Sequence, residues 1–337
     1  MNSLQTFSIR RSKGLFVVGL GILTILTAVL SLGIGSVQVA PKDVLAALFG
    51  QDTVSTSARI ILYSRLPRMC AALLAGAALA VSGMVIQTVL NNPLASPSII
   101  GVNSSAGFAV ALVCAVAPSM QQYTPYIAFA GALIGVLLVM VLSQSTVAAK
   151  ITVVLAGVAI SQLFSAGIDA VVTFVPDALS GVTDFRIGGF NGVTMVQLLP
   201  ACRVILISIV ILMTLSGRLD ILALGSDTAK SLGLAVGPTR VIFLVFAAAL
   251  AGAAVSFSGL IGFVGLIVPH MMRRLIGEES GVLLPASAMG GAFFVTICDL
   301  LARVMFAPFE IPVGIVLAFA GAPFFLWLLF KQRGGRT

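Results

Sequence analysis

Few side chains in this sequence could take part in chemistry, and two acidic ones stand out because they interrupt long apolar runs. Asp169 and Asp299 each lie inside such a run, and a carboxylate in a membrane is costly enough to be a candidate for function. Arg303 follows Asp299 by four residues, which predicts an ion pair on one helix face and a structural role. Asp169 has no such neighbour. It could relay protons, or it could lie in water near the outer end of its run.

Motifs of enzymatic chemistry are absent from the sequence. It contains no GxxxxGK[ST] phosphate loop, no HExxH and no nucleophile elbow. His270 is the single histidine and the four cysteines form no CxxC pair, so no metal site is expected. We therefore expect neither an enzyme nor a protein with a bound cofactor. The cysteines are predicted to be free thiols at Cys70, Cys114, Cys202 and Cys298.

The composition excludes a soluble globular domain and a disordered chain. Of the 337 residues, 59% are hydrophobic and only 9% are charged, whereas a soluble domain has about 25% charged residues. So few charges cannot cover the surface of a soluble protein of this length. The net charge is +8, but the basic residues gather at the ends of apolar runs, as signals of membrane topology do. The charge therefore does not indicate a nucleic-acid partner.

Ten apolar segments approach the length of about 20 residues that a helix needs to cross a membrane. The sequence predicts an all-α polytopic membrane protein with one transmembrane domain over residues 1–337. A cytoplasmic N-terminus puts most of the 19 lysines and arginines on the cytoplasmic side. Residues 257–265 could be a turn or a broken helix. The predicted spans are 14–35, 66–90, 99–117, 125–143, 151–175, 197–216, 241–258, 260–273, 283–306 and 313–330.

Seven basic residues fall on the outer side, and four of these break the charge trend most clearly: Arg59, Arg65, Arg68 and Arg303. Such side chains can extend to the membrane surface or form ion pairs. Arg65 and Arg68 have no acidic residue nearby in the sequence, so docking of a partner protein is an equal alternative for them.

Two short segments indicate an internal repeat. Ala75–Gly83 (AGAALAVSG) and Ala251–Gly259 (AGAAVSFSG) share Ala, Gly, Ala, Ala, Ser and Gly in register. Small residues let helices approach closely in lipid, and compositional bias could also produce the match. An odd number of spans between the two segments would make the repeat inverted, as in many transporters.

Two connections carry further signals. Residues 217–240 form the longest inner loop, in which Ser226 and Asp227 have the chemistry that begins a short helix and Gly233 ends it. This loop could dock another protein or lie on lipid headgroups. Asn91–Pro97 contains two prolines, which stop a helix. It could form the mouth of a pathway or an ordinary turn.

A family resemblance rests on several motifs in order. Arg65–Val102, RLPRMCAALLAGAALAVSGMVIQTVLNNPLASPSIIGV, resembles the signature of FecCD-type permeases. These are membrane subunits of bacterial ABC importers for ferric siderophores, haem and cobalamin. Leu222–Leu234, Gly262–Arg273 and Glu310–Leu329 resemble the family as well. The resemblance thus extends over nearly the whole chain.

The resemblance implies a type II ABC importer permease in the cytoplasmic (inner) membrane of a bacterium, with ten spans and both termini in the cytoplasm. It implies a second permease subunit, identical or paralogous, two separate ATPase subunits, an extracytoplasmic substrate-binding protein, and the lipid bilayer as partners. Transport would proceed by alternating access, with a ferric siderophore preferred as substrate over haem or cobalamin. The alternative from another class is a proton-coupled secondary transporter that uses Asp169.

The resemblance also assigns roles to residues of this sequence. It implies that Arg65, Arg68 and Arg303 meet acidic residues of the binding protein, through the fork geometry that suits arginine to carboxylates. It implies a gate at Asn92, Pro93 and Leu94, with Leu94 as an apolar plug opposite Lys150 and Thr152. Lys150 departs from some relatives by placing a charge there. The implied ATPase coupling loop comprises Leu224, Gly225, Ser226, Asp227, Ala229, Leu232 and Gly233.

Overall fold

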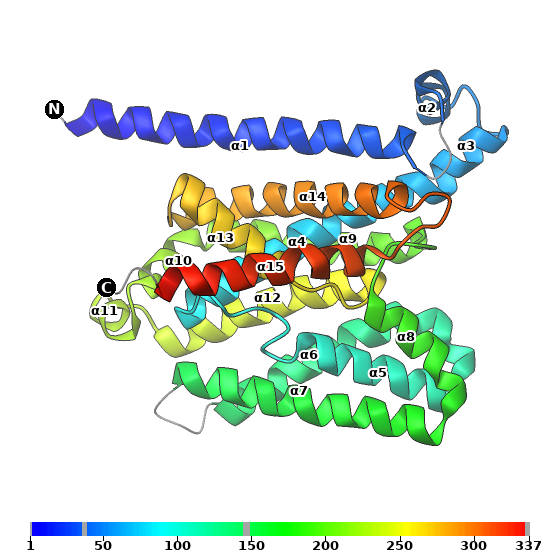
Figure 1. Ribbon diagram of the computed structural model, residues 1–337. Helices are drawn as coiled ribbons and strands as arrows, with labels where there is room; N and C mark the ends of the chain where they lie inside the picture. Colours follow the sequence, from blue (N-terminus) through cyan, green and yellow to red (C-terminus); the bar gives the residue numbers. More distant parts are fainter. Residues whose placement is uncertain (1, 36–38, 144–148, 334–337) are drawn as a thin grey trace.

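The computed structural model describes residues 2–35, 39–143 and 149–333, and the regular secondary structure of this part of the chain is helical, without a β-strand (Figure 1). Most helices lie along one common direction. We call the end of the bundle that carries α8 (Leu179–Ile187) the α8 end, and the opposite end, with α11 (Ser226–Ser231), the α11 end. Helix α1 starts and α15 finishes at the α11 end.

Each of the ten predicted spans corresponds to one helix. Within the described residues, seven helical stretches are long and apolar enough to cross a membrane, α5 and α15 supply shorter apolar helices, and α13 is a further short helix. The ten helices are α1 (Asn2–Gly33), α4 (Leu66–Leu90), α5 (Val102–Val116), α6 (Thr124–Ser143), α7 (Ala149–Phe174), α9 (Met195–Thr214), α12 (Val236–Ser258), α13 (Val264–Ile276), α14 (Ser280–Val304) and α15 (Val313–Arg333).

Shorter helices connect the long ones. At the α8 end, Ser55 accepts a hydrogen bond from the Ala58 backbone N–H (3.1 Å) and so caps α3. A small separate core, which includes Leu32 of α1 and Ile61 of η1 and residues of α2 and α3, packs beside it. The short helices are α2 (Pro41–Leu48), α3 (Thr56–Ile60), the π-helix η1 (Ile61–Arg65), the 3₁₀ helices η2 (Pro118–Tyr123) and η3 (Pro176–Ala178), and α10 (Ser216–Ala223).

Helices α4 and α12 form the centre of the bundle and contain the two similar nine-residue segments. Both helices are mostly buried, and Ser82 of α4 donates a hydrogen bond to the Ala247 carbonyl of α12 (2.6 Å). Helix α4 follows α3 from the α8 end, whereas α12 follows α11 from the α11 end. The two helices therefore run in opposite directions, as an inverted repeat requires.

Glycines bring the central helices into backbone contact. A Cβ atom added to Gly76 of α4 would lie 2.2 Å from the Gly291 carbonyl oxygen of α14. A Cβ added to Gly83 would lie 2.0 Å from the Gly265 carbonyl oxygen of α13. No side chain fits at such distances, so the small residues of this sequence serve helix packing.

Residues 259–263 break the helix between α12 and α13. Gly259 and Phe263 both have a φ of +66°, a left-handed conformation that ends regular helix. The stretch 257–265, which the sequence left open between a turn and a broken helix, is thus a break between two separate helices.

The contact at Gly76 gives a stability prediction. We expect Gly76→Ala to lower the free energy of unfolding by about 1–3 kcal/mol, because α4 and α14 must move apart to admit the methyl group. Gly19→Ala in α1, where no atom lies within 4 Å of the added Cβ, is the matched control and should be neutral or stabilising by up to about 1 kcal/mol. Thermal unfolding in detergent measures both. If the two variants unfolded at the same temperature, the close contact between Gly76 and Gly291 would be contradicted.

Candidate functional site

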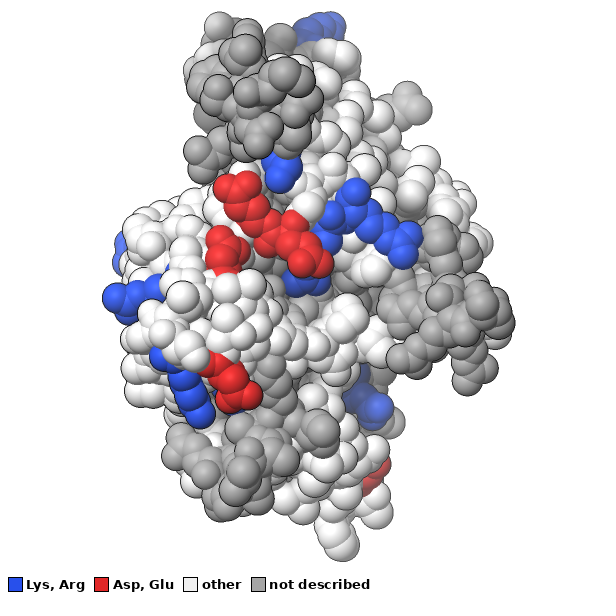
Figure 2. Space-filling model, turned by 90° about the vertical axis from the view of Figure 1, so that its left-hand side faces the viewer, with Lys and Arg blue, Asp and Glu red and all other residues white. Residues whose placement is uncertain are grey.

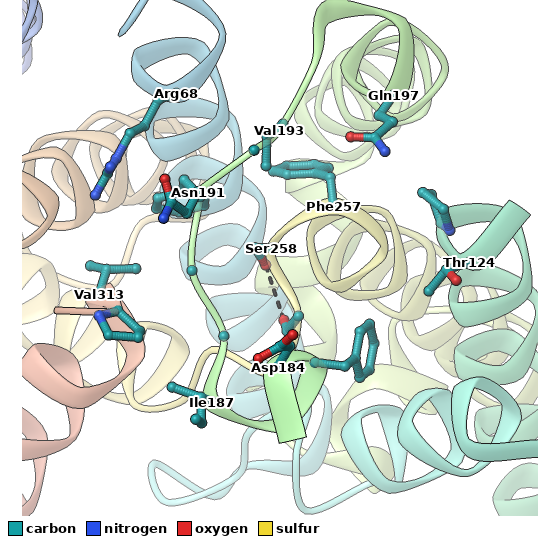
Figure 3. Close-up of a pocket in the computed structure, with 18 of the residues that line it drawn as sticks. Arg68, Thr124, Asp184, Ile187, Asn191, Val193, Gln197, Phe257, Ser258 and Val313 are labelled. Atoms are coloured by element: carbon teal, nitrogen blue, oxygen red, sulfur yellow. Dashed lines mark hydrogen bonds between the residues drawn. The ribbon is translucent and has the colours of Figure 1, made fainter. Parts of the chain in front are cut away.

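A cavity of about 810 Å³ opens at the α8 end of the bundle (Figure 3). Its walls come from α8, the loop 188–193, η2, the first turns of α4, α6 and α9, the end of α12 and residues 310–313, which lead into α15. This volume is in the range of small-molecule sites. The polar and charged side chains of its lining are Arg68, Gln121, Thr124, Asp184, Asn191, Gln197, Ser256, Ser258 and Glu310.

The wall around α8 is held by backbone hydrogen bonds between three segments. Leu260 N–H donates to the Phe185 carbonyl (2.9 Å), and Gly189 N–H donates to the Ser258 carbonyl (2.8 Å). Gly314 N–H of α15 donates to the Gly188 carbonyl (3.2 Å). These bonds join the end of α8 to the break after α12 and to the start of α15. Movement of any of these segments therefore shifts the cavity wall.

We call the place where the end of α8 meets the break after α12 and the start of α15 the α8 junction. A Cβ atom added to its glycines would collide with the backbone of a neighbouring segment. At Gly314 it would lie 2.0 Å from the Ile187 carbonyl oxygen, and at Gly259 it would lie 2.5 Å from the Phe185 carbonyl oxygen. Gly188 adds a φ of +71° that favours glycine. The junction therefore requires glycine on all three segments.

Behind the cavity, a buried cluster joins α4, α14 and the segment before α15. Asp299 is 1% exposed and lies between two arginines. Its Oδ1 lies 3.0 Å from Arg68 Nε, and its Oδ2 lies 3.2 Å from Arg303 Nε. Arg68 also pairs with Glu310 through Nη1. The ion pair expected from the spacing of Asp299 and Arg303 is thus present, within a larger cluster.

Two arginines also bind the end of α1. Arg65 Nη1 donates to the carbonyls of Leu32 (2.7 Å) and Gly33 (2.8 Å), and Arg303 Nη1 donates to the Ser31 carbonyl (3.0 Å). The last carbonyls of a helix lack partners within the helix and carry partial negative charge. The arginines satisfy them and fix α1 to the bundle at the α8 end.

The three arginines expected to dock a binding protein are therefore buried in this chain. Arg65, Arg68 and Arg303 are 6%, 7% and 3% exposed, so an exposed patch made of them is not what the structure shows. Arg68 has no acidic residue nearby in the sequence, and its ion-pair partners Asp299 and Glu310 lie 231 and 242 residues further along the chain. Sequence proximity could not reveal contacts of such separation.

At the α11 end, which faces the viewer in Figure 2, the predicted coupling loop is folded and largely exposed. Leu224 and Leu232 are 61% and 59% exposed on either side of α11, whereas Ala229 is fully buried beneath it. Gly225 and Gly233 have φ values of +102° and +81° and form the two turns. The short helix forms as expected, although its N-cap is Gly225 and no side chain caps it. Ser226, instead, accepts a hydrogen bond from Arg240 (3.2 Å).

The predicted gate turn lies next to the broken helix pair. Asn92 Oδ1 accepts a hydrogen bond from the Leu94 backbone N–H (2.9 Å). Pro93 and Leu94 line a small cavity together with α13 and α15 residues that include His270 and Phe324. Thr152 lies in the first turn of α7, and the side chain of Lys150 lies outside the described residues. The gate role of these five residues stays a prediction.

Sequence reasoning did not identify an interaction that fixes this region. Gln87 Nε2 donates to the Gly265 carbonyl (2.9 Å), and its Oε1 accepts from Arg273. Arg273 Nη2 also donates to Thr88 Oγ1 (3.1 Å). Helix α13 is thereby tied to the end of α4, immediately before the gate turn. The sequence signal that could have revealed this interaction is Gln87, whose polar amide side chain lies inside the apolar run 66–90.

Asp169 does not take part in a polar network in the structure. It lies on the exposed surface of α7, and among the described residues its carboxylate makes no ion pair or hydrogen bond. A proton relay requires further groups that accept and pass the proton. The geometry around Asp169 provides none within the described part of the chain, so it gives the proton-coupled alternative no support.

Taken together, a bundle of membrane-length helices, a polar cavity at one end and a folded exposed loop at the other define a polytopic membrane protein with features of a transporter. The chain matches the family model described as the FecCD transport family over residues 23–331, and it belongs to this family.

Curated relatives cover almost the whole chain. The Fe(3+)-citrate import system permease protein YfmE of Bacillus subtilis (strain 168) is 39% identical over 319 residues, which span 93% of this chain and 94% of the relative. The hemin transport system permease protein HmuU of Yersinia pestis is 35% identical over 325 residues, which span 94% of this chain and 97% of the relative.

A solved structure has the same fold. It is described as an inward-facing conformation of an ABC transporter assigned to the metal-chelate type. The match has a TM-score of 0.81 and 32% sequence identity, and it covers 94% of this chain and 99% of that chain.

The buried cluster gives a second stability prediction. We expect Asp299→Asn to lower the free energy of unfolding by about 3–5 kcal/mol, because it leaves Arg68 and Arg303 buried without their common counter-charge. Asp169→Asn, which replaces the exposed aspartate of another span, is the matched control and should change stability by less than about 0.5 kcal/mol. Denaturant unfolding in detergent measures the free energy of unfolding of both variants. If Asp299→Asn left this free energy unchanged, the cluster would not stabilise the fold.

Proposed function

We propose that this protein is the permease subunit of an ATP-driven importer that carries an iron chelate across the cytoplasmic membrane of a bacterium. The observation that carries the proposal is the whole-length membership of the FecCD transport family, joined to a structure with a polar cavity at one end and an exposed folded loop at the other. The relatives carry names for ferric citrate and hemin transport. A ferric siderophore is our preferred substrate, with haem or cobalamin as the alternatives.

The charge distribution supports an orientation with the α11 end in the cytoplasm. Loops on the cytoplasmic side of membrane proteins carry an excess of lysine and arginine. Segments at the α11 end contain five such residues, Lys13, Arg218, Lys230, Arg240 and Arg274. The α8 end then faces outward. The polar cavity opens toward the side from which a nutrient arrives.

Two ATPase subunits, one for each permease subunit of a pair, would bind at the α11 end. Leu224 and Leu232 are large apolar side chains exposed beside a short helix, and such side chains become binding anchors when a partner buries them. The backbone turns at Gly225 and Gly233 present both leucines on one folded loop. ATP hydrolysis in the partner would act on the permease through this loop.

The substrate-binding protein would dock at the α8 end. Arg59 and Arg186 are exposed there and can meet carboxylates of a partner. Arg65, Arg68 and Arg303 lie beneath this surface and hold α1, α4 and α14 in place. In our proposal the buried arginines shape the docking surface, and the exposed ones contact the partner.

Alternating access would use the breaks in the bundle as joints. The α8 junction lines the outer cavity, and the turn with Asn92, Pro93 and Leu94 adjoins α13 and α15 at the other end. Leu94 is the apolar plug of this proposal, with Lys150 and Thr152 on the opposite side of the path. Rocking of α13 and α15 would open the two ends in turn.

Co-purification with candidate ATPase and binding proteins tests the proposal at both ends of the molecule. Leu232→Asp should weaken ATPase retention at least about tenfold, because a buried leucine contributes about 1.5–3 kcal/mol. The same variant should retain the binding protein. The double variant Arg59→Glu, Arg186→Glu should weaken binding-protein retention about tenfold by charge reversal and should leave ATPase retention unchanged.

Each variant thus serves as the control for the other. Val54→Asp adds a second control for the leucine, because Val54 is 73% exposed in a loop outside α11. If the wild-type chain is folded and retains no ATPase, or if Leu232→Asp retains it as well as Val54→Asp does, the proposed assembly is wrong.

A further inference from the structure

We propose that Gln87 and Arg273, which are hydrogen-bonded to each other, are positioning residues of the transport cycle. They tie the gate turn, residues 92–94, to α13, so that Leu94 moves together with this helix. The inference rests on the proposed function, because it treats the turn as the inner gate of the permease. It deepens that function by naming the two side chains through which a moving helix carries the gate.

Arg273, in the last turn of α13, holds the last turns of α4. Its guanidinium donates to Gln87 Oε1 and to Thr88 Oγ1, the second at 3.1 Å. A third, longer bond reaches the Met84 carbonyl (3.3 Å). Gln87 is 2% exposed, and its Nε2 donates in turn to the Gly265 carbonyl of α13 (2.9 Å). Because polar and charged groups between membrane helices are costly, this network is a candidate for function.

Two contacts fix the orientation of α13 relative to α4. They lie at Gly265 and at Arg273, which are separated by about 12 Å along the helix at its usual rise per residue. At the first contact the backbones touch, since a Cβ added to Gly83 would lie 2.0 Å from the Gly265 carbonyl oxygen. A helix that is held at two separate points cannot turn independently of its neighbour. Helix α13 and the end of α4 therefore move as one body.

Hydrogen bonds continue from Gln87 into the gate turn. The Gln87 carbonyl accepts a hydrogen bond from the Asn92 N–H (3.0 Å), and Asn92 Oδ1 accepts one from the Leu94 N–H (2.9 Å). Asn91 between them has a φ of +48°, and this left-handed conformation ends α4. Consecutive hydrogen bonds thus lead from Arg273 through Gln87 and Asn92 to Leu94, so a displacement of α13 reaches the gate turn directly.

Another face of α13 meets α15 through side chains around a small cavity. The side chains from α13 and its N-cap lie at helical spacing: Phe263, Leu266, Ile267 and His270. Leu94 and Phe324 line the same cavity, and the His270 and Phe324 rings meet edge to face with centroids 6.1 Å apart. Packed side chains can slide past one another in small steps, whereas movement of α13 away from α4 would break the hydrogen bonds of Arg273. We therefore place the movement between α13 and α15, with Leu94 on the α13 side.

Thiol labelling at position 94 in the permease–ATPase complex tests the tie without a chelate. The parent chain carries Leu94→Cys and has its four native cysteines replaced by alanine, and the reagent is a water-soluble maleimide. We expect its labelling rates without nucleotide and with ATP plus vanadate to differ at least about tenfold, because the population of the open gate shifts. Gln87→Met and Arg273→Met should each reduce this difference to less than about twofold, since the gate turn no longer follows α13.

Further variants separate positioning from stability, and co-purification of the ATPase shows whether each variant is folded and assembled. Gln87→Glu keeps an acceptor for Arg273 in a charge-assisted bond and should keep the difference of the parent chain. Arg274→Met removes the neighbouring exposed arginine of α13 and should keep it as well. Arg273→Lys keeps the charge but loses the fork that binds Gln87 and Thr88 together. It should give an intermediate difference, and it serves if a methionine variant does not assemble.

Each result separates the tie from the proposed function. If Gln87→Met or Arg273→Lys keeps the full difference, or if Gln87→Glu loses it, the inference is wrong and the proposed function stands. Equal labelling rates of the parent chain in both nucleotide states would overturn the gate and the tie together. ATP-dependent uptake of iron by vesicles tests the proposed function separately.

Discussion

The position of Asp299 between Arg68 and Arg303 is the interaction on which the architecture of the α8 end depends. Inside a membrane no water satisfies a charge, so each buried ion must find its partners within the protein. One carboxylate here joins α4 to α14, and its two arginines extend the contact to Glu310 and to the last carbonyls of α1. Helices α1, α4 and α14 and the segment with Glu310 are thereby fixed at a single point, and the cavity and the outer surface are built around them.

Glycine contacts provide the complementary constraint in the apolar interior. Where Gly76 meets Gly291 and Gly83 meets Gly265, the backbones touch and no side chain intervenes. Van der Waals contact between close backbones holds helices together in lipid, where the hydrophobic effect does not. The same principle operates at the α8 junction, where Gly259 and Gly314 admit the carbonyls of α8. The interior is therefore rigid within helices and can bend where they break.

The sequence allowed the secondary structure to be predicted more fully than the site. Each apolar run became a helix, because length and hydropathy decide this locally, and the spacing of Asp299 and Arg303 placed that pair on one helix face. The ion pair of Arg68 with Asp299 could not be predicted, since it depends on the packing of α4 against α14. Arg65 and Arg68 were expected to be available to a partner for the same reason. The position of Asp184 in the cavity lining could not be predicted either, because it depends on the packing of α8 against α12 and α15.

The two ends of the molecule suggest how its parts divide the task of transport. The α11 end offers exposed leucines on an ordered loop, and the α8 end offers a polar cavity whose wall is continuous with α12 and α15. Because α12 begins beside the loop and ends at the junction, one helix spans the distance between the two. Motion that starts at the loop can reach the cavity through it, without a chain of ionisable groups across the membrane.

The most direct test of this account is uptake of radioactive iron chelate by vesicles that contain the permease, its ATPase and its binding protein. We expect uptake to require ATP on the side of the membrane that the α11 end faces. Uptake should persist when a protonophore removes the proton gradient, and it should be absent without ATP. Uptake that proceeds without ATP and stops with the protonophore would contradict the account and would indicate proton coupling instead.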